Sequence, residues 1–212
     1  MSDIKKLLQN EEFYNSSTHF FGALLSIYGA FVLWNMAQAD ITKNAVLVFG
    51  ASLFILFLCS AVYHAIVKED LKKIFQKIDH SAIYILIAGT YTPILLSVLS
   101  YPISAILLAV TWIIALIGII YSCITVKFKY LSTGLYLLMG WMALFLFYSI
   151  WHNASHLAMW FLFIGGIFYT LGCVFYLSKK EYMHAVWHLF VIGGAMSHYF
   201  CIYEIVKAIN IH

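Results

Sequence analysis

The chain has 212 residues, of which 64% are hydrophobic and only 10% are charged. Soluble domains are typically about 45–50% apolar and about 25% charged, so this composition excludes a water-soluble globular protein and an intrinsically disordered one. The formal net charge of +3 comes from lysines that form no recurring basic stripe, and nucleic acid is therefore not an expected partner. The four isolated cysteines exclude a disulfide scaffold and a CxxC metal knuckle.

Seven long apolar runs follow one another along the chain. Each is about 20 residues long, which is the length that one helix needs to cross the hydrocarbon core of a bilayer. The runs are apolar on all sides, unlike the striped helices of soluble bundles. We therefore predict an all-α integral membrane protein in which residues 1–212 form one seven-helix domain, with a polar tail over residues 1–18. The runs cover residues 19–38, 44–66, 80–99, 103–123, 131–150, 155–177 and 184–206.

The lysines are distributed unevenly between the two sides of the predicted membrane. Positively charged residues are enriched in cytoplasmic loops. Ten lysines fall on the side of the N-terminal tail, whereas only Lys43 and Lys207 fall on the other side. This asymmetry predicts a cytoplasmic N-terminus and, after seven crossings, a C-terminus outside. The ten lysines are Lys5, Lys6, Lys68, Lys72, Lys73, Lys77, Lys127, Lys129, Lys179 and Lys180.

The second link, over residues 67–79, is both charged and amphipathic. Its apolar residues recur at i, i+3, i+4 and i+7, while its lysines take other helix faces. This pattern predicts a short helix that lies on the inner leaflet with its lysines toward anionic headgroups. A solvated loop with chance periodicity is the alternative, because short amphipathic windows are common. The apolar positions are Leu71, Ile74, Phe75 and Ile78.

Histidines from several runs fall at one level of the predicted membrane, near its cytoplasmic face. Ionisable groups at membrane depth are costly and usually functional. His184 and His188 form an i, i+4 pair, and this spacing lets one helix offer two nitrogens to one metal ion. His64, at the end of the second run, supplies a third nitrogen. Three protein ligands with water in the fourth place are typical of catalytic zinc, so we predict a Zn²⁺ site on these three histidines.

Two further residues lie beside the predicted metal site. Asp79 precedes the third run at the same level, and Ser60 lies one helical turn from His64. Asp79 could ligate the metal directly, or it could hold the metal's water and act as a general base, with Ser60 orienting either residue. His80 could take the place of Asp79. For each histidine alone, the alternative is a packing residue that is hydrogen-bonded to a neighbouring helix.

Other polar residues inside the runs are candidates for a cavity. His19 opens the first run and could be a spare ligand, although a hydrogen bond that positions the first helix is favoured. His198 lies further along the last run, on nearly the same helix face as the first histidine of the pair. Residues 89–93, Gly-Thr-Tyr-Thr-Pro, should kink the third run. Thr90 and Tyr91 could then offer hydroxyls to a polar headgroup, and an ordinary proline kink is the alternative.

Taken together, these motifs resemble those of the hemolysin III family of bacterial membrane proteins, which is related to the progestin and adipoQ receptors. The resemblance covers nearly the whole chain, and its motifs are specific as a set rather than singly. They are Glu12-x-x-Asn15-x-x-Thr18-His19, Ser60-x-x-x-His64 with Lys77-Ile78-Asp79, His184-x-x-x-His188, and residues 89–93 with His198.

The resemblance implies seven helices with a cytoplasmic N-terminus, in a bacterial cytoplasmic (inner) membrane. It also implies zinc on His64, His184 and His188, with Asp79 near the metal water and Ser60 beside it. The wider superfamily includes alkaline ceramidases, which implies hydrolysis of a lipid amide. The sequence departs from the receptor branch because His80, not an aromatic residue, follows the aspartate, and because the receptors' long N-terminal domain is missing. A hormone-receptor role is therefore not expected.

Three functions remain open at the level of the sequence. The first is a zinc-dependent intramembrane hydrolase that acts on a lipid amide or ester. The second is a pore-forming haemolysin, which the family name suggests, although the middles of the runs are largely apolar. The third is a non-enzymatic sensor or regulator of membrane lipid state, in which zinc is structural. Membrane lipids are the expected partners in each case, one of them as substrate in the first, and the oligomeric state stays open.

Overall fold

The computed structural model describes the backbone of residues 2–210 and the side chains of residues 10–210. Within that part of the chain, seven helical segments are long and apolar enough to cross a membrane, which confirms the predicted all-α fold class. The helices are α1 (Ser2–Met36), α2 (Asp40–Ala65), α3 (Glu69–Val98), α4 (Ile103–Ile124), α5 (Lys129–Trp141), the 3₁₀ helix η1 (Met142–Leu146), α6 (Phe147–Asn153), α7 (His156–Leu177) and α8 (Met183–Ile209).

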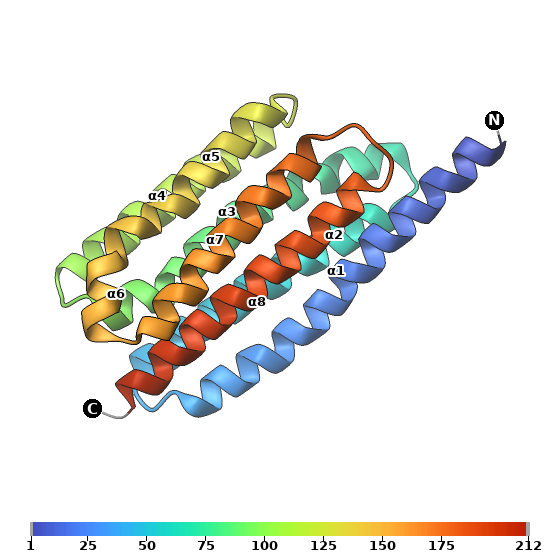
Figure 1. Cartoon of the computed structure of the whole chain (residues 1–212). Coiled ribbons are helices and arrows are strands. Elements are labelled where there is room, and N and C mark those ends of the chain that lie inside the picture. Colours follow the sequence, from blue (N-terminus) through green and yellow to red (C-terminus); the bar gives the residue numbers. More distant parts are fainter. Residues whose placement is uncertain (1, 211–212) are drawn as a thin grey trace.

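Helix α8 is the central element of the bundle. It packs against α1, α2, α3 and α7, and the sequence neighbours α1 and α2, α2 and α3, and α3 and α4 pack as consecutive pairs. Figure 1 shows α8 between α1 and α7, with α4 and α5 on the side remote from α1. The N- and C-terminal ends of the chain lie at opposite ends of the bundle. Side chains of α8 can therefore meet residues from several helices at once.

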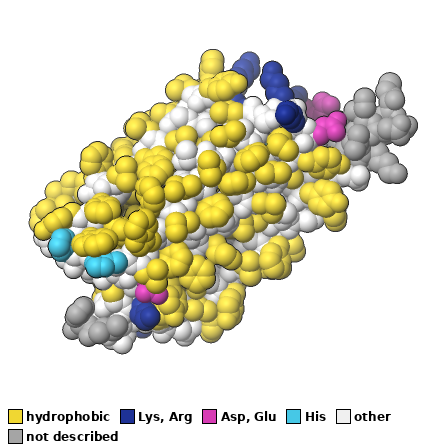
Figure 2. Space-filling model, in the orientation of Figure 1, with side chains coloured by type: hydrophobic (Ala, Val, Ile, Leu, Met, Phe, Trp, Pro, Cys, Tyr) yellow, Lys and Arg dark blue, Asp and Glu magenta, His cyan; other side chains and the backbone are white. Residues whose placement is uncertain are grey.

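The outer surface between the two ends of the bundle is apolar. Large side chains such as Phe31, Ile117 and Val174 are 63%, 63% and 66% exposed. Figure 2 shows hydrophobic side chains covering this face, with the charged side chains gathered near its ends. A bilayer offers no hydrogen-bond partners to the backbone, so helices, which satisfy their own backbone groups, are suited to cross it. The chain is an integral membrane protein.

Two helices begin earlier than the apolar runs alone suggest. α1 begins at Ser2, inside the predicted polar tail, although the side chains of Lys5 and Lys6 lie outside the described residues. α3 begins at Glu69, so most of the predicted link over residues 67–79 is continuous with the third crossing and is not a separate short helix. The physical reason is that hydropathy marks where lipid contact ends, whereas backbone hydrogen bonding can carry a helix beyond that point.

One interior segment differs from the predictions, because the run at 131–150 is not one uniform helix and η1 separates α5 from α6. Helix α3 continues through Pro93, and the predicted kink at residues 89–93 stays a prediction. The hydroxyl of Thr92 donates to the carbonyl of Ala88 over 2.9 Å. Threonine side chains and packed neighbours allow proline to be tolerated inside a membrane helix.

Candidate metal centre

The structure brings three predicted ligands together at one end of the bundle. His64 comes from the last turn of α2, and His184 and His188 come from the first two turns of α8. One ring nitrogen from each of the three lies within 4.8 Å of the others. The Nε2 atoms of His64 and His184 are 3.3 Å apart. The i, i+4 pair lies on one face of α8 because of helix periodicity, whereas its meeting with His64 depends on how α2 and α8 pack.

Two of these histidines have hydrogen-bond partners on their outer side. The Nδ1 atom of His64 lies 2.5 Å from the Oε2 atom of Glu12. The Nδ1 atom of His188 lies 3.2 Å from the backbone carbonyl oxygen of Asn15. Both acceptors lie on α1. Because a carboxylate and a carbonyl can only accept, each contact places the ring proton on Nδ1 and leaves Nε2 unprotonated.

The donor set fits a divalent metal ion such as zinc. His188 is fully buried, and its Nε2 atom has no hydrogen-bond partner among the described residues. A buried nitrogen without a partner is costly, and a bound cation would remove that cost. Neutral imidazole nitrogens with a carboxylate or carbonyl behind them are the usual arrangement of histidine ligands at zinc. The structure therefore provides a candidate three-histidine site, which agrees with the predicted ligand set.

Asp79 and Ser60 lie beside this cluster in the interior. Asp79, on α3, is 5% exposed, and Ser60, on α2, is 2% exposed. Both line a cavity of about 560 Å³ that extends through the bundle. The buried Ser60 hydroxyl has no hydrogen-bond partner within residues 10–210. Their placement at the cavity wall suits the predicted roles in chemistry, and whether Asp79 contacts the metal directly stays a prediction.

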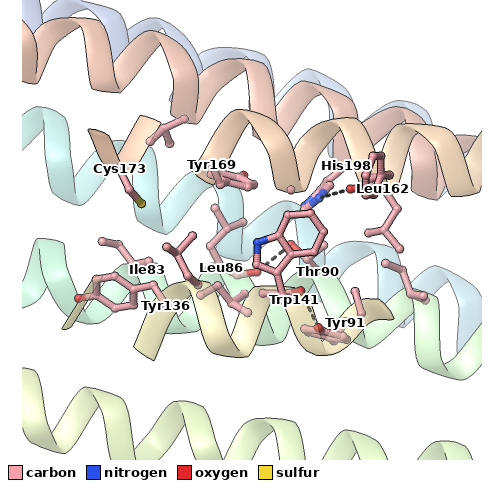
Figure 3. Close-up of a pocket in the computed structure, with 18 of the residues that line it drawn as sticks. Ile83, Leu86, Thr90, Tyr91, Tyr136, Trp141, Leu162, Tyr169, Cys173 and His198 are labelled. Atoms are coloured by element: carbon pink, nitrogen blue, oxygen red, sulfur yellow. Dashed lines mark hydrogen bonds between the residues drawn. The ribbon is translucent and has the colours of Figure 1, made fainter. Parts of the chain in front are cut away.

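The cavity is lined mostly by apolar side chains from α3, α5, α7 and α8. Figure 3 shows Trp141 of α5 extending between His198 on one side and Tyr91 on the other. The indole Nε1 of Trp141 donates to the hydroxyl of Thr170 over 3.0 Å.

Three residues predicted for a cavity, Thr90, Tyr91 and His198, do line it. Their polar atoms already have backbone partners. The Thr90 hydroxyl donates to the Leu86 carbonyl, and the Tyr91 hydroxyl lies 2.9 Å from the Met139 carbonyl. The Nε2 atom of His198 lies 3.3 Å from the Leu162 carbonyl. In this structure the Thr90 hydroxyl bonds within α3, whereas Tyr91 and His198 join their helices to neighbouring ones, and a role of the two hydroxyls toward a headgroup stays a prediction.

His19 differs from the prediction in how it contacts its neighbours. Its ring stacks on that of His188, with centroids 3.7 Å apart and an interplanar angle of 15°. Both of its ring nitrogens are buried and have no hydrogen-bond partner in the described part of the chain. The hydrogen bond that we predicted for His19, which would position the first helix, is thus not present among the described residues. Stacking aligns His19 with His188 instead, and His19 also lines the large cavity.

His80 lies on a different side of α3 from the large cavity. Successive helix residues are separated by about 100°. It lines a second cavity of about 250 Å³, together with Lys129, His184 and Asp79. This smaller cavity is more polar, since Gln76 and other polar side chains also face it. Neither His80 nor Asp79 belongs to the three-histidine cluster, and Asp79 alone of the two also lines the large cavity, so the alternative in which His80 replaces Asp79 stays a prediction.

Sequence reasoning missed Glu12 as a partner of the site. Glu12 lies 52 positions before His64 along the chain, and it belongs to what appeared to be a polar tail. Its other carboxylate oxygen, Oε1, accepts a hydrogen bond from Lys72 on α3. The pattern Glu12-x-x-Asn15 carried the family resemblance, but a sequence cannot state which helix such residues face. Only the packing of α1 against α2 shows the contact.

Comparison with known proteins finds a family match over most of the chain. Residues 8–199 match the family model described as "Haemolysin-III related". The chain belongs to the haemolysin III-related family. This confirms the family resemblance, and the matched span contains every residue of the candidate metal centre.

Named relatives of this haemolysin III-related chain come from bacteria and from mammals. "Hemolysin-3" of Bacillus cereus is 41% identical over 197 residues, covering 91% of this chain and 90% of the relative. "Hemolysin-3 homolog" of Bacillus subtilis (strain 168) is 42% identical over 199 residues, covering 91% of this chain and 92% of the relative. Human "Monocyte to macrophage differentiation factor" is 31% identical over 198 residues, covering 90% of this chain and 82% of the relative.

Proposed function

We propose that the protein is a zinc-dependent intramembrane hydrolase that cleaves a lipid amide or ester. One observation carries this proposal: three buried or half-buried histidines direct ring nitrogens to one point, beside an apolar cavity of about 560 Å³. A metal alone would be compatible with a structural role. A large apolar cavity lined by Asp79 and Ser60, the two residues predicted to lie beside the metal, favours chemistry on a lipid.

Each residue has a separate role in the proposed reaction. His64, His184 and His188 would hold the ion, which when bound supplies a Lewis acid that polarises the acyl carbonyl and lowers the pKa of water to about 7. Asp79 takes a proton from the water that attacks the acyl carbon. It returns the proton to the leaving amine or alcohol as the C–N or C–O bond breaks. Ser60, on the same cavity wall, has a hydroxyl without a partner in the described chain, and in the proposed reaction this hydroxyl would donate to the Asp79 carboxylate and orient it.

The surface around the cavity supports lateral entry of a lipid. Leu144, Phe147 and Trp160 line the cavity and are also 52%, 51% and 54% exposed on the outside of the bundle. They come from η1, α6 and α7, so the cavity wall reaches the lipid-facing surface between these elements. An acyl chain could enter there without crossing water. The smaller polar cavity beside Asp79 and His184 is suited to a polar leaving group.

Product analysis tests the proposed reaction. We expect the purified zinc-loaded protein to release a free acyl chain from at least one member of a panel of ceramides, phospholipids and simple acyl esters. After chelation of the metal, release should stop, and it should return when zinc is added back. Stoichiometric zinc without any product across the panel would contradict the hydrolase proposal while leaving the metal centre intact.

We also propose that the N-terminus is cytoplasmic and that the protein resides in the bacterial cytoplasmic membrane. Support comes from the ten-to-two distribution of the lysines in the sequence, and Figure 2 shows a group of lysine side chains near one end of the drawn face. A C-terminal fusion to alkaline phosphatase should be active in cells, because that enzyme requires an oxidising compartment outside the cytoplasm. If the phosphatase fusion is inactive and a separate C-terminal fusion to a fluorescent protein that folds only in the cytoplasm is fluorescent, the C-terminus is cytoplasmic and the proposed orientation is wrong.

A second candidate is a regulator in which zinc is structural. The observation in its favour is that the ligands come from α2 and α8, so a bound ion would join two helices far apart in the sequence. Loss of zinc would then reduce stability, while the Asp79 carboxylate would be dispensable. The relatives' name, haemolysin, suggests a pore instead. An apolar cavity lining does not favour a water-filled pore.

A further inference from the structure

We infer that one turn of α1, from Glu12 to Asn15, orients two of the three histidines of the proposed metal centre, and that Glu12 is its main positioning residue. This inference rests on the proposed metal centre but makes a separate claim about residues outside the ligand set. It assigns a role to a conspicuous carboxylate that the proposed reaction does not use.

The first supporting contact is between Glu12 and His64. The Oε2–Nδ1 distance is 2.5 Å, and the His64 side chain is only 4% exposed, whereas that of Glu12 is 35% exposed. The carboxylate accepts the Nδ1 proton, so Nε2 is left free on the inner side, where it lies 3.3 Å from Nε2 of His184. A carboxylate behind an imidazole holds its tautomer and ring orientation and makes the nitrogen that faces the metal more basic.

The second contact fixes the carboxylate itself. Lys72, on α3, donates to the Oε1 atom of Glu12 and also lies 5.4 Å from the centre of the Tyr63 ring. Each oxygen of the carboxylate therefore has its own partner, one on α2 and one on α3. This two-sided arrangement restricts rotation of the Glu12 carboxylate. Lys72 is thus a support for the positioning residue, and it has no contact with a predicted ligand.

The third contact comes from the same turn of α1. The Asn15 carbonyl oxygen lies 3.2 Å from Nδ1 of His188, which belongs to α8. Glu12 and Asn15 are separated by three positions, so they lie on neighbouring parts of one helix face. A single helical turn therefore holds ligands that belong to two other helices. Among its described residues, from Asn10 onward, α1 contributes no ligand to the cluster, and its contribution is orientation.

Zinc affinity of purified variants tests this role directly. We expect Glu12→Gln to weaken zinc binding about 10-fold and Glu12→Ala up to about 100-fold in competition with a chromophoric chelator, the range typical of residues behind metal ligands. Glu11→Gln removes a neighbouring carboxylate and should change the affinity less than about twofold, within the scatter of remote substitutions. Lys72→Met should weaken zinc binding, with Lys73→Met as its matched control.

A second readout separates positioning from a general effect on folding. Cobalt substituted for zinc reports ligand geometry through its visible absorption bands, and we expect Glu12→Gln to shift those bands while the metal-free melting temperature stays close to that of the wild type. A lowered melting temperature with unchanged bands and affinity would mean that Glu12 only stabilises the fold. Equal zinc affinity in wild type and Glu12→Gln would overturn the inference. Absence of zinc binding by the wild type would instead refute the metal centre itself.

Discussion

Replacement of His188 by alanine is expected to abolish stoichiometric zinc binding. His188 is fully buried, and its Nε2 atom has no hydrogen-bond partner within the described residues, so a bound ion is the partner that the metal proposal assigns to this nitrogen. Removal of a direct ligand should lower zinc affinity by more than the about 10- to 100-fold that outer residues cause. Metal analysis of purified protein should fall from about one zinc per chain, the stoichiometry of a single three-histidine site, to near zero.

The control for this experiment lies in the same chain. His152 is exposed, in α6, outside the three-histidine cluster. His152→Ala should retain the zinc content and the zinc-dependent rise in melting temperature. Because bound metal stabilises the folded state by mass action, His188→Ala should lose that rise even if its metal-free stability is unchanged. Full zinc content in His188→Ala would show that these three histidines are not the metal site.

Asp79→Asn is expected to remove hydrolysis while retaining zinc. Asparagine has nearly the same shape as aspartate but cannot accept the proton that the reaction releases. Loss of a general acid–base residue typically lowers the rate about 10²- to 10⁴-fold. We expect a decrease of that size in acyl release, measured on whichever lipid the wild type cleaves. Asp70→Asn, at the exposed start of α3, is the matched control and should retain the rate.

The metal content of Asp79→Asn distinguishes the remaining alternatives for this residue. Retained zinc together with lost turnover would assign Asp79 to proton transfer. Lost zinc would make Asp79 a direct ligand. Retained zinc with unchanged cellular function would favour the structural, non-enzymatic role of the metal. Wild-type turnover in this variant would contradict the general-base assignment.

Much of the architecture could be predicted because membranes restrict the choice of structure. Apolar runs of about 20 residues have few stable alternatives to membrane-spanning helices, so the seven crossings followed from hydropathy alone. The pairing of His184 with His188 was also predictable, because helix periodicity is a local property. Their convergence with His64 depended on a further assumption, namely that the end of the second run and the start of the seventh lie at the same depth in the membrane. The structure places all three together.

Other features were not accessible from local patterns. The interruption of the fifth crossing by η1 and the continuity of α3 through Pro93 depend on backbone hydrogen bonding that hydropathy does not report. Thr90 and Tyr91 were candidates to offer hydroxyls to a polar headgroup, with an ordinary proline kink as the alternative, and in the structure both hydroxyls bond to backbone carbonyls. Polar groups in a helix can satisfy themselves locally or across a helix interface, and composition does not distinguish these outcomes.

The sequence by itself determined that this is a seven-helix membrane protein and which histidines share a level of the bilayer, because chain length, hydropathy and helix periodicity act locally. Only the tertiary structure decided which helix faces meet. The rotation and packing of α1 bring Glu12 to His64, and the arrangement of α3, α5, α7 and α8 encloses the cavity. Contacts between residues 52 positions apart depend on the packing of whole helices, and no short stretch of sequence specifies that packing.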